Sequence, residues 1–203
     1  MQLGFFNTEK QEVELPSISG LQYIPDFIMQ QEHQSLLAVI DASPWLLDLK
    51  RRVQHYGYKY DYQKRSIDPS MKVGELPAWA LEIGKRMYQQ EIISFVPDQV
   101  IINEYEPGQG IAPHIDCEPC FESVIISMSL GSSCLIDFYS KRDLKVKKSI
   151  RLDPRSLLVI KGESRYEWLH GIAGRKSDTI NGEKVKRTRR VSLTFRKVIL
   201  NVV

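Results

Sequence analysis

The chain has 203 residues, of which 26% are charged and 42% hydrophobic, a composition typical of a soluble globular protein with one domain. No stretch approaches the roughly 20 apolar residues of a membrane span, so we expect no membrane partner. The count of three cysteines is low and odd, which does not suggest a secreted disulfide framework, and the N-terminus lacks a signal pattern. We therefore expect a cytoplasmic protein, and we expect it to be a monomer.

The net charge of +3 hides an uneven distribution of charged residues. Residues 1–140 carry 10 Lys and Arg against 19 Asp and Glu, whereas residues 141–190 carry 16 against 6. The basic segments KRDLKVKKSIR and KVKRTRR can face a polyanion such as nucleic acid, or they can be solvated loops and strand edges. If the chain binds nucleic acid, we expect the first of these segments to contact phosphates.

The first half of the chain predicts two amphipathic helices. In QQEHQSLLAVIDAS, residues 30–43, the apolar Leu36, Leu37 and Ile40 recur at helical spacing. PAWALEIGKRMYQQEI, residues 77–92, begins with a proline suited to a first helical turn and repeats apolar residues at similar spacing. Between them, QHYGYKYDYQKRSIDPS alternates tyrosines with other residues, which indicates a strand or hairpin that runs into a loop.

From about Gln99 the apolar period changes to two, which is typical of β-strands. Turn residues separate the strand-like runs, and no helical stretch interrupts them. Such a series predicts an antiparallel sandwich, here a C-terminal jelly roll with helices packed outside it, so the fold class is α+β, mainly β. The eight runs are residues 99–105, 110–116, 123–130, 133–140, 149–153, 156–162, 166–172 and 189–198.

His114 and Asp116 are separated by one residue in a predicted strand, so their side chains point to the same face. A third candidate ligand, His170, lies at the end of another predicted strand. Two histidines and one carboxylate form the facial triad that holds non-haem Fe(II) and leaves positions open for other ligands. An HxD pair also arises by chance, so a site without metal stays an alternative on these three residues alone.

Arg190 and Arg196 are six residues apart in the last predicted strand and share a face. Arginines that point into a barrel need anions to meet them, because burial of an unpaired charge is costly. Asn103 and Tyr105 also share a strand face and can donate hydrogen bonds. A small dicarboxylate that chelates the iron at one end and meets arginine at the other would satisfy all four side chains. Alternatively, the arginines pair with local acids or face solvent.

Cys117-x-x-Cys120 follows the HxD pair directly and has the spacing of a zinc knuckle or a redox dithiol. Zinc would need two further ligands, and Cys134 stands alone. The pair also does not open a helix of a βαβ unit, where a thioredoxin-type dithiol belongs. We expect both cysteines to line the loop above the iron, where their thiols are candidates for oxidation to a disulfide or a sulfenic acid.

Four blocks resemble, in order and spacing, the AlkB-like Fe(II)/2-oxoglutarate dioxygenases: NEYEPGQGIAPHID, SMSLGSSCLIDF, SLLVIKGESRYEWLHGI and RRVSLTFRK. The resemblance spans roughly Leu21 to Val198. It implies a double-stranded β-helix core and an enzyme that uses Fe(II), 2-oxoglutarate and O2, with ascorbate as reductant in vitro. We expect residues 1–20 to be an N-terminal extension and residues 21–203 to form a single AlkB-like domain.

The resemblance also assigns roles within that domain. About 50–80 would be a nucleotide-recognition lid, and about 98–198 the jelly-roll core. The iron ligands and catalytic residues would be His114, Asp116 and His170. The residues that hold 2-oxoglutarate would be Asn103, Tyr105, Arg190 and Arg196, with Arg190 and Tyr105 at the distal carboxylate and the other two near the iron.

AlkB-like enzymes act mostly on nucleic acids and typically flip a base under the N-terminal lid. The lid candidate HYGYKYDYQKRSIDPSMKVGELPAW interleaves aromatic and basic residues, which suits base stacking and phosphate contact, although alternating tyrosines also fit a half-buried strand. Glu118 lies two residues after the ligand aspartate, where family members place a polar base-reading side chain. We assign substrate binding to Tyr58, Tyr60, Glu118 and Arg165.

The segment CEPCFESV departs from the DNA-repair members of the family. The pattern HIDxxxxFExxIxSxSLGSxxxxDF is instead similar to the oxygenase domain of animal tRNA wobble-uridine hydroxylases. We interpret the chain as an enzyme that oxidatively dealkylates N-methylated nucleobases in DNA or RNA, for DNA repair or RNA modification. The alternatives are hydroxylation of a tRNA wobble-uridine side chain and oxidation of a protein or lipid-derived substrate.

Overall fold

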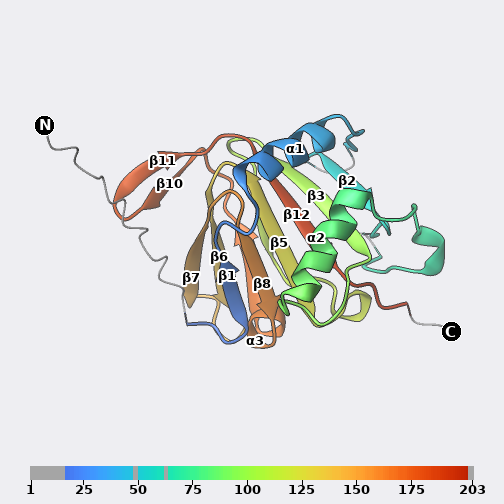
Figure 1. Ribbon diagram of the computed structural model, residues 1–203. Helices are drawn as coiled ribbons and strands as arrows, with labels where there is room; N and C mark the ends of the chain where they lie inside the picture. The colour runs from blue at the N-terminus through green and yellow to red at the C-terminus, as the bar shows by residue number, and fades with distance from the viewer. Residues whose placement is uncertain (1–16, 48–49, 62–63, 201–203) are drawn as a thin grey trace, which may run out of the picture.

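Two antiparallel sheets are stacked face to face in the computed structural model, which describes residues 17–47, 50–61 and 64–200 (Figure 1). The larger sheet has the strand order β1-β8-β5-β12-β3-β2. All neighbouring strands in it run antiparallel. Its strands are β1 (Leu21–Ile24), β2 (Val53–Tyr56), β3 (Gln99–Tyr105), β5 (Val124–Gly131), β8 (Leu157–Lys161) and β12 (Arg190–Arg196).

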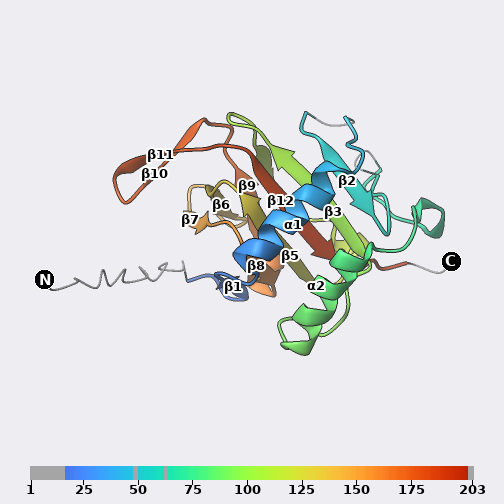
Figure 2. The same ribbon diagram turned by 45° about the horizontal axis from the view of Figure 1, so that its top comes forward.

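The smaller sheet has the strand order β4-β9-β6-β7 and is also antiparallel. A separate hairpin extends from one end of the stacked sheets (Figures 1 and 2). The two sheets together form the predicted jelly roll, so the prediction of fold class is confirmed. The strands of the smaller sheet are β4 (Ile111–His114), β6 (Cys134–Ser140), β7 (Lys147–Leu152) and β9 (Trp168–Ile172), and those of the hairpin are β10 (Ser177–Ile180) and β11 (Glu183–Lys186).

Two helices, α1 (Gln30–Asp41) and α2 (Ala78–Gln89), cover the outer face of the larger sheet (Figure 2). In α2 the buried residues recur at helical spacing, so one stripe of the helix packs against the sheet. Both predicted helices are confirmed. Within the described residues, no helix is long and apolar enough to cross a membrane. The short helical turns are η1 (Pro69–Met71), η2 (Glu118–Cys120) and α3 (Glu163–Tyr166).

The larger sheet separates two hydrophobic cores. One core lies between the sheets, where Ile125 and Leu158 pack in the same cluster as Phe138 and Ile150 of the smaller sheet. The other joins the opposite face of the larger sheet to the helices. Because successive strand residues point to opposite faces, each central strand contributes to both cores and reads as an almost continuous apolar run. Each fully buried large side chain contributes roughly 1.5–3 kcal/mol.

Several parts of the fold differ from the sequence predictions. The strand predicted over residues 110–116 ends at His114, so Asp116 lies in the loop that follows it and not in the strand. The strand predicted over residues 166–172 begins at Trp168, because α3 occupies the residues before it. The β10–β11 hairpin was not predicted, since its strands, half of whose residues are exposed, lack apolar alternation. Its turn residues, Asn181 and Gly182, both have positive φ, the conformation that an Asn-Gly pair favours in a two-residue hairpin turn. The predicted domain limits stay predictions, and residues 1–16 lie outside the described residues.

Candidate active site

Strands β4 and β9 bring two histidines opposite each other. His114 pairs with His170 in register, and the ring centroids are 4.5 Å apart. Gly171 permits this approach of the strands, since a Cβ there would lie 2.8 Å from the backbone nitrogen of Pro113. The Nδ1–H of His114 donates to the carbonyl oxygen of Ala112 at 2.9 Å, which leaves Nε2 free to bind a metal.

Asp116 joins the two histidines from the loop that follows β4. One of its carboxylate oxygens lies 3.4 Å from Nε2 of His170, and the other lies 3.1 Å from Nη2 of Arg196. One possible ligand atom from each of His114, Asp116 and His170 lies within 4.8 Å of the others. In the described part of the chain this is the one such cluster of three, and a single ion can be reached by all three side chains.

The surroundings hold Asp116 and His170 in the protonation states that bind metal. Burial would by itself raise the pKa of Asp116, but the charges of Arg196 and the two histidines outweigh it and lower the pKa to about 2. Burial and the neighbouring His114 lower the pKa of His170 to about 4, although Asp116 opposes this shift. At neutral pH the site therefore offers a carboxylate and a neutral imidazole.

Arg165 holds the backbone next to the triad. Its Nη1 donates to the carbonyl oxygen of Asp116 at 2.9 Å, and its Nη2 donates to that of Cys117 at 3.3 Å. The side chain is almost completely buried, and burial lowers its pKa. The sequence prediction assigned Arg165 to substrate binding, whereas the structure places its guanidinium against these two carbonyls.

Two buried arginines of β12 have nitrogens that no described protein atom satisfies. Arg190 is 3% exposed, and its Nη2 donates to Oγ of Ser129 at 2.9 Å. Its Nε and Nη1, and the Nε of Arg196, have no hydrogen-bond partner among the described residues. Because buried donors of a charged group are costly to leave unpaired, this part of the site fits an anion such as a carboxylate.

A cavity of about 720 Å³ between the sheets is lined by all seven residues predicted to hold iron and 2-oxoglutarate. On β3, Tyr105 pairs with Arg190 of β12, and Asn103 pairs with Ser192. The Cζ of Arg190 lies 5.5 Å from the centre of the Tyr105 ring. Burial raises the pKa of Tyr105, so its hydroxyl keeps its proton and can donate a hydrogen bond to an anion. The residues present thus fit Fe(II) and 2-oxoglutarate.

Two of the four residues predicted to bind substrate also line this cavity. Tyr60 packs its ring against Phe121, with ring centroids 5.6 Å apart, and Glu118 lies at the cavity two residues after Asp116. Tyr58 is not among the lining residues; it packs, half-buried, against the core between the sheets. Their roles in substrate binding stay predictions.

The cavity is also lined by three cationic residues that the sequence analysis did not single out as site residues: Arg51, Arg65 and Lys141. Arg65 belongs to the predicted lid, and Lys141 begins the basic segment predicted to contact phosphates. The basic composition of these two segments indicated contact with nucleic acid, but no sequence spacing connects Arg65 or Lys141 to the triad. Arg51 also falls within the predicted lid limits of about 50–80, but it precedes the aromatic and basic segment quoted for the lid, residues 55–79. Only the fold brings the three segments together.

Cys117 and Cys120 form a disulfide bond in the loop that follows the triad aspartate. Their sulfur atoms lie 3.2 and 3.3 Å from the carbonyl oxygen of Arg65, so this loop packs against the predicted lid segment. Cys117 lines the cavity, and Cys120 is buried behind it. The third cysteine, Cys134, is free and buried.

The chain is similar to known proteins in sequence and in fold. A family model described as the 2OG-Fe(II) oxygenase superfamily matches residues 46–196. Uncharacterized protein L905 of Acanthamoeba polyphaga mimivirus is 39% identical over 90% of this chain and 87% of its own length. A Xenopus tropicalis protein named tRNA (carboxymethyluridine(34)-5-O)-methyltransferase alkbh8 is 38% identical over 92% of this chain, which spans 33% of that protein's length. The solved structure of OsALKBH1 shares the fold, with a TM-score of 0.67 and 19% identity over 88% of this chain and 96% of that one.

Proposed function

Because the chain belongs to the 2OG-Fe(II) oxygenase superfamily, as an AlkB-like Fe(II)- and 2-oxoglutarate-dependent dioxygenase, we propose that it oxidises a modified nucleobase in RNA. Transfer RNA is the first substrate class that we propose, with a uridine side chain as the oxidised group. The name of the frog relative supports this choice, but the chain spans only 33% of that protein. The further activities of the whole relative are therefore not transferred to this chain.

The observation that carries the proposal is the composition of the cavity. It extends from the triad to Tyr60, Arg65 and Lys141, so an aromatic ring and two cations lie on the walls of the same space. Aromatic rings stack on bases, and exposed cations meet phosphates. A cavity of about 720 Å³ can hold both a small dicarboxylate and a base, because typical small-molecule sites are roughly 300–1,000 Å³.

Different side chains of the cavity would hold the metal and the cofactor. His114, Asp116 and His170 would hold Fe(II) on one face and leave the other face open. Arg190 and Arg196 would meet the carboxylates of 2-oxoglutarate with the nitrogens that have no partner among the described residues. When bound, iron and 2-oxoglutarate supply the oxidation of a carbon–hydrogen bond by O2, with succinate and CO2 as by-products.

The remaining walls exclude water and orient the substrate. Ile125, Ile136 and Ile160 line the cavity between the sheets, so the reacting carbon would sit among apolar side chains. A dry site protects the oxidising centre from side reactions and strengthens the contacts of charged groups with the cofactor.

A second candidate is the dealkylation of N-methylated bases, which the sequence favoured. Glu118 supports it, because its carboxylate lines the cavity beside the triad. The methylated bases 1-methyladenine and 3-methylcytosine carry a positive charge, and a carboxylate next to the reacting group favours a cation. The products of the two reactions differ, since a hydroxylated N-methyl group is lost as formaldehyde whereas a hydroxylated methylene keeps its oxygen.

Nucleoside mass spectrometry tests both candidates. Bulk tRNA, methylated RNA and methylated DNA are incubated with the protein, Fe(II), ascorbate and 2-oxoglutarate, and formaldehyde and succinate are measured in parallel. The control is Asp116→Ala, which removes one predicted iron ligand. We expect an oxygen-containing uridine derivative in tRNA. Formaldehyde release from methylated oligonucleotides would favour the second candidate. An enzyme that converts 2-oxoglutarate to succinate but alters none of the nucleic acids would overturn both.

A further inference from the structure

Two neighbouring arginines contact opposite faces of the end of strand β3. Arg51 donates from Nε to Oδ1 of Asn103 at 2.8 Å. Arg52 donates from Nε and Nη2 to the carboxylate of Glu104 at 2.5 and 2.7 Å. Successive residues of a strand point to opposite faces, so Asn103 faces the cavity while Glu104 faces outward. The two arginines therefore act on different sides of the same strand.

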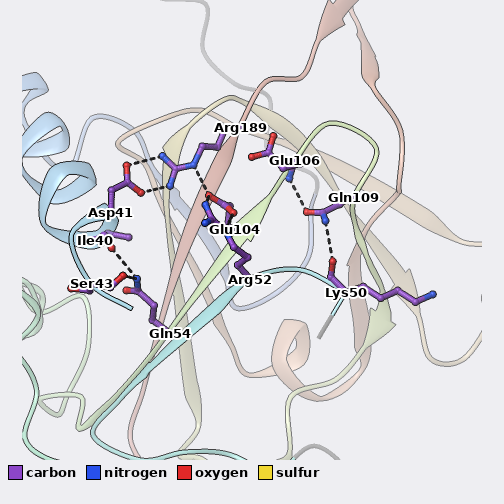
Figure 3. A network of polar contacts seen from close by, with 10 residues as sticks. All are labelled: Ile40, Asp41, Ser43, Lys50, Arg52, Gln54, Glu104, Glu106, Gln109 and Arg189. Atoms are coloured by element: carbon purple, nitrogen blue, oxygen red, sulfur yellow. Dashed lines mark hydrogen bonds and ion pairs between the residues drawn. The ribbon is translucent and has the colours of Figure 1, made fainter. Parts of the chain in front are cut away.

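The outward side is a clamp of paired charges (Figure 3). Glu104 is 2% exposed, and Nε of Arg189 donates to its Oε1 at 2.6 Å in addition to the contacts from Arg52. Arg189 also pairs with Asp41 at the end of α1. These contacts join β3, the end of α1 and the residues just before β2 and β12, and they lie on the face of β3 away from the cavity. We assign them a structural role.

The inward side has a different composition, because Arg51 lines the cavity. Its Cζ lies 5.7 Å from the centre of the Tyr105 ring, which Arg190 approaches to 5.5 Å. Arg51 thus contacts both β3 residues that are predicted to hold 2-oxoglutarate. Its positive charge also acts against the rise that burial causes in the pKa of Tyr105.

The contact with Arg51 determines which end of the Asn103 amide faces the cofactor. A guanidinium has donors and no acceptor, so only the amide oxygen can meet it. The Nδ2 of Asn103 then points elsewhere as a donor, which is what a carboxylate or keto oxygen requires. Without Arg51, the amide can rotate and present its oxygen to the anion, which would replace an attraction by a repulsion.

We propose that Arg51 is a positioning residue for 2-oxoglutarate, which acts by fixing the Asn103 amide with its nitrogen toward the cofactor. The proposal depends on the cofactor site and not on the identity of the substrate, so it stands or falls separately from the activity on RNA. It also extends the cofactor site beyond the strands that carry the motif residues, to the segment before β2.

Equilibrium binding of 2-oxoglutarate to the Mn(II)-loaded full chain tests the proposal without any turnover. We expect Arg51→Met to raise the Kd for 2-oxoglutarate about five- to ten-fold, the factor that corresponds to the net contribution of one hydrogen bond. Asn103→Ala should raise the Kd at least as much. Because Arg51 acts through Asn103, the double variant should bind no more weakly than Asn103→Ala alone. Arg51→Lys, which keeps a charged donor, should recover part of the affinity.

The matched control is Arg52→Met, which changes the neighbouring arginine on the other face of β3. It should lower the melting temperature and leave the Kd for 2-oxoglutarate within about two-fold of the wild-type value. Three results would overturn the proposal: an unchanged Kd in Arg51→Met, effects of Arg51→Met and Asn103→Ala that multiply in the double variant, or an equal loss of affinity in Arg52→Met. The last result would mean that any disturbance of the end of β3 weakens binding.

Discussion

Replacement of Arg190 by methionine should stabilise the protein without its cofactor and remove its stabilisation by 2-oxoglutarate. Arg190 is 3% exposed, and Ser129 is the hydrogen-bond partner that the described residues provide, while Nε and Nη1 have none. A buried charge and two donors are thus left unpaired in the free protein. Methionine is similarly long and flexible but uncharged, so it can fill the same space without this cost.

The size of the effect follows from the contacts of Arg190. An unpaired buried charge costs several kcal/mol. The hydrogen bond to Ser129 and the contact with the Tyr105 ring, 5.5 Å away, each offset roughly 1–2 kcal/mol. We therefore expect Arg190→Met to gain about 1–2 kcal/mol in the free energy of unfolding, which raises the Tm by roughly 2–8 °C. In the wild type, 2-oxoglutarate at 100 times its Kd should add about 2.7 kcal/mol, and the variant should lose this gain.

Thermal and urea denaturation of the Mn(II)-loaded protein, with and without 2-oxoglutarate, measure both quantities. A suitable control is Arg187→Met. Arg187 is also buried, but it donates to both carboxylate oxygens of Asp178 at 2.6 and 2.7 Å and to the carbonyl oxygen of Ala173 at 2.7 Å. Loss of this satisfied pair should destabilise the protein by about 3–5 kcal/mol. The reasoning is refuted if Arg190→Met is clearly less stable than the wild type, or if 2-oxoglutarate still stabilises it.

Three further predictions concern the β3 clamp, the disulfide and the cations of the cavity. Glu104→Gln should lower the free energy of unfolding in urea by about 1–2 kcal/mol, because the partly exposed Arg52 and Arg189 lose their shared carboxylate while Arg189 keeps Asp41. The double variant Cys117→Ser/Cys120→Ser should still bind stoichiometric Fe(II) by metal analysis, and loss of that iron would assign the metal to the sulfurs instead of the triad. Arg65→Glu and Lys141→Glu should weaken RNA binding similarly for all sequences and reduce the salt slope by about 1 each; an unchanged slope would count against nucleic acid as substrate.

The cavity residues of β3 and β12 could be predicted, because in a strand an even spacing places two side chains on the same face. Arg190 and Arg196 share a face of β12 at an even spacing, and Asn103 and Tyr105 do so on β3. This alternation depends only on local backbone conformation, so a strand prediction is enough to place the side chains together. The grouping of several such pairs in one cavity then required the resemblance to a known family.

Arg51 and Arg165 show what the sequence could not reveal. The contact of Arg51 depends on the register of β2 against β3, which joins residues 52 positions apart and has no local signature. Arg165 lies in the short helix α3, where the direction of a side chain depends on how the helix packs. The sequence prediction assigned Arg165 to substrate binding, and the structure places its guanidinium against two backbone carbonyls beside Asp116.

Hydrogen bonding and position together separate the structural arginines from those predicted to hold the cofactor. Arg187 is buried with protein acceptors for its Nε and both terminal nitrogens. Arg165 has acceptors for its terminal nitrogens, while its Nε has none among the described residues, and it does not line the cavity. Arg190 and Arg196 are equally buried but keep donors without partners in the described chain, all on the wall of one cavity. Folding leaves these donors buried and unsatisfied, which costs free energy. Binding of an anion that accepts hydrogen bonds from them offsets this cost. Cofactor affinity and apo stability are therefore opposed at Arg190, and a substitution there should move them in opposite directions.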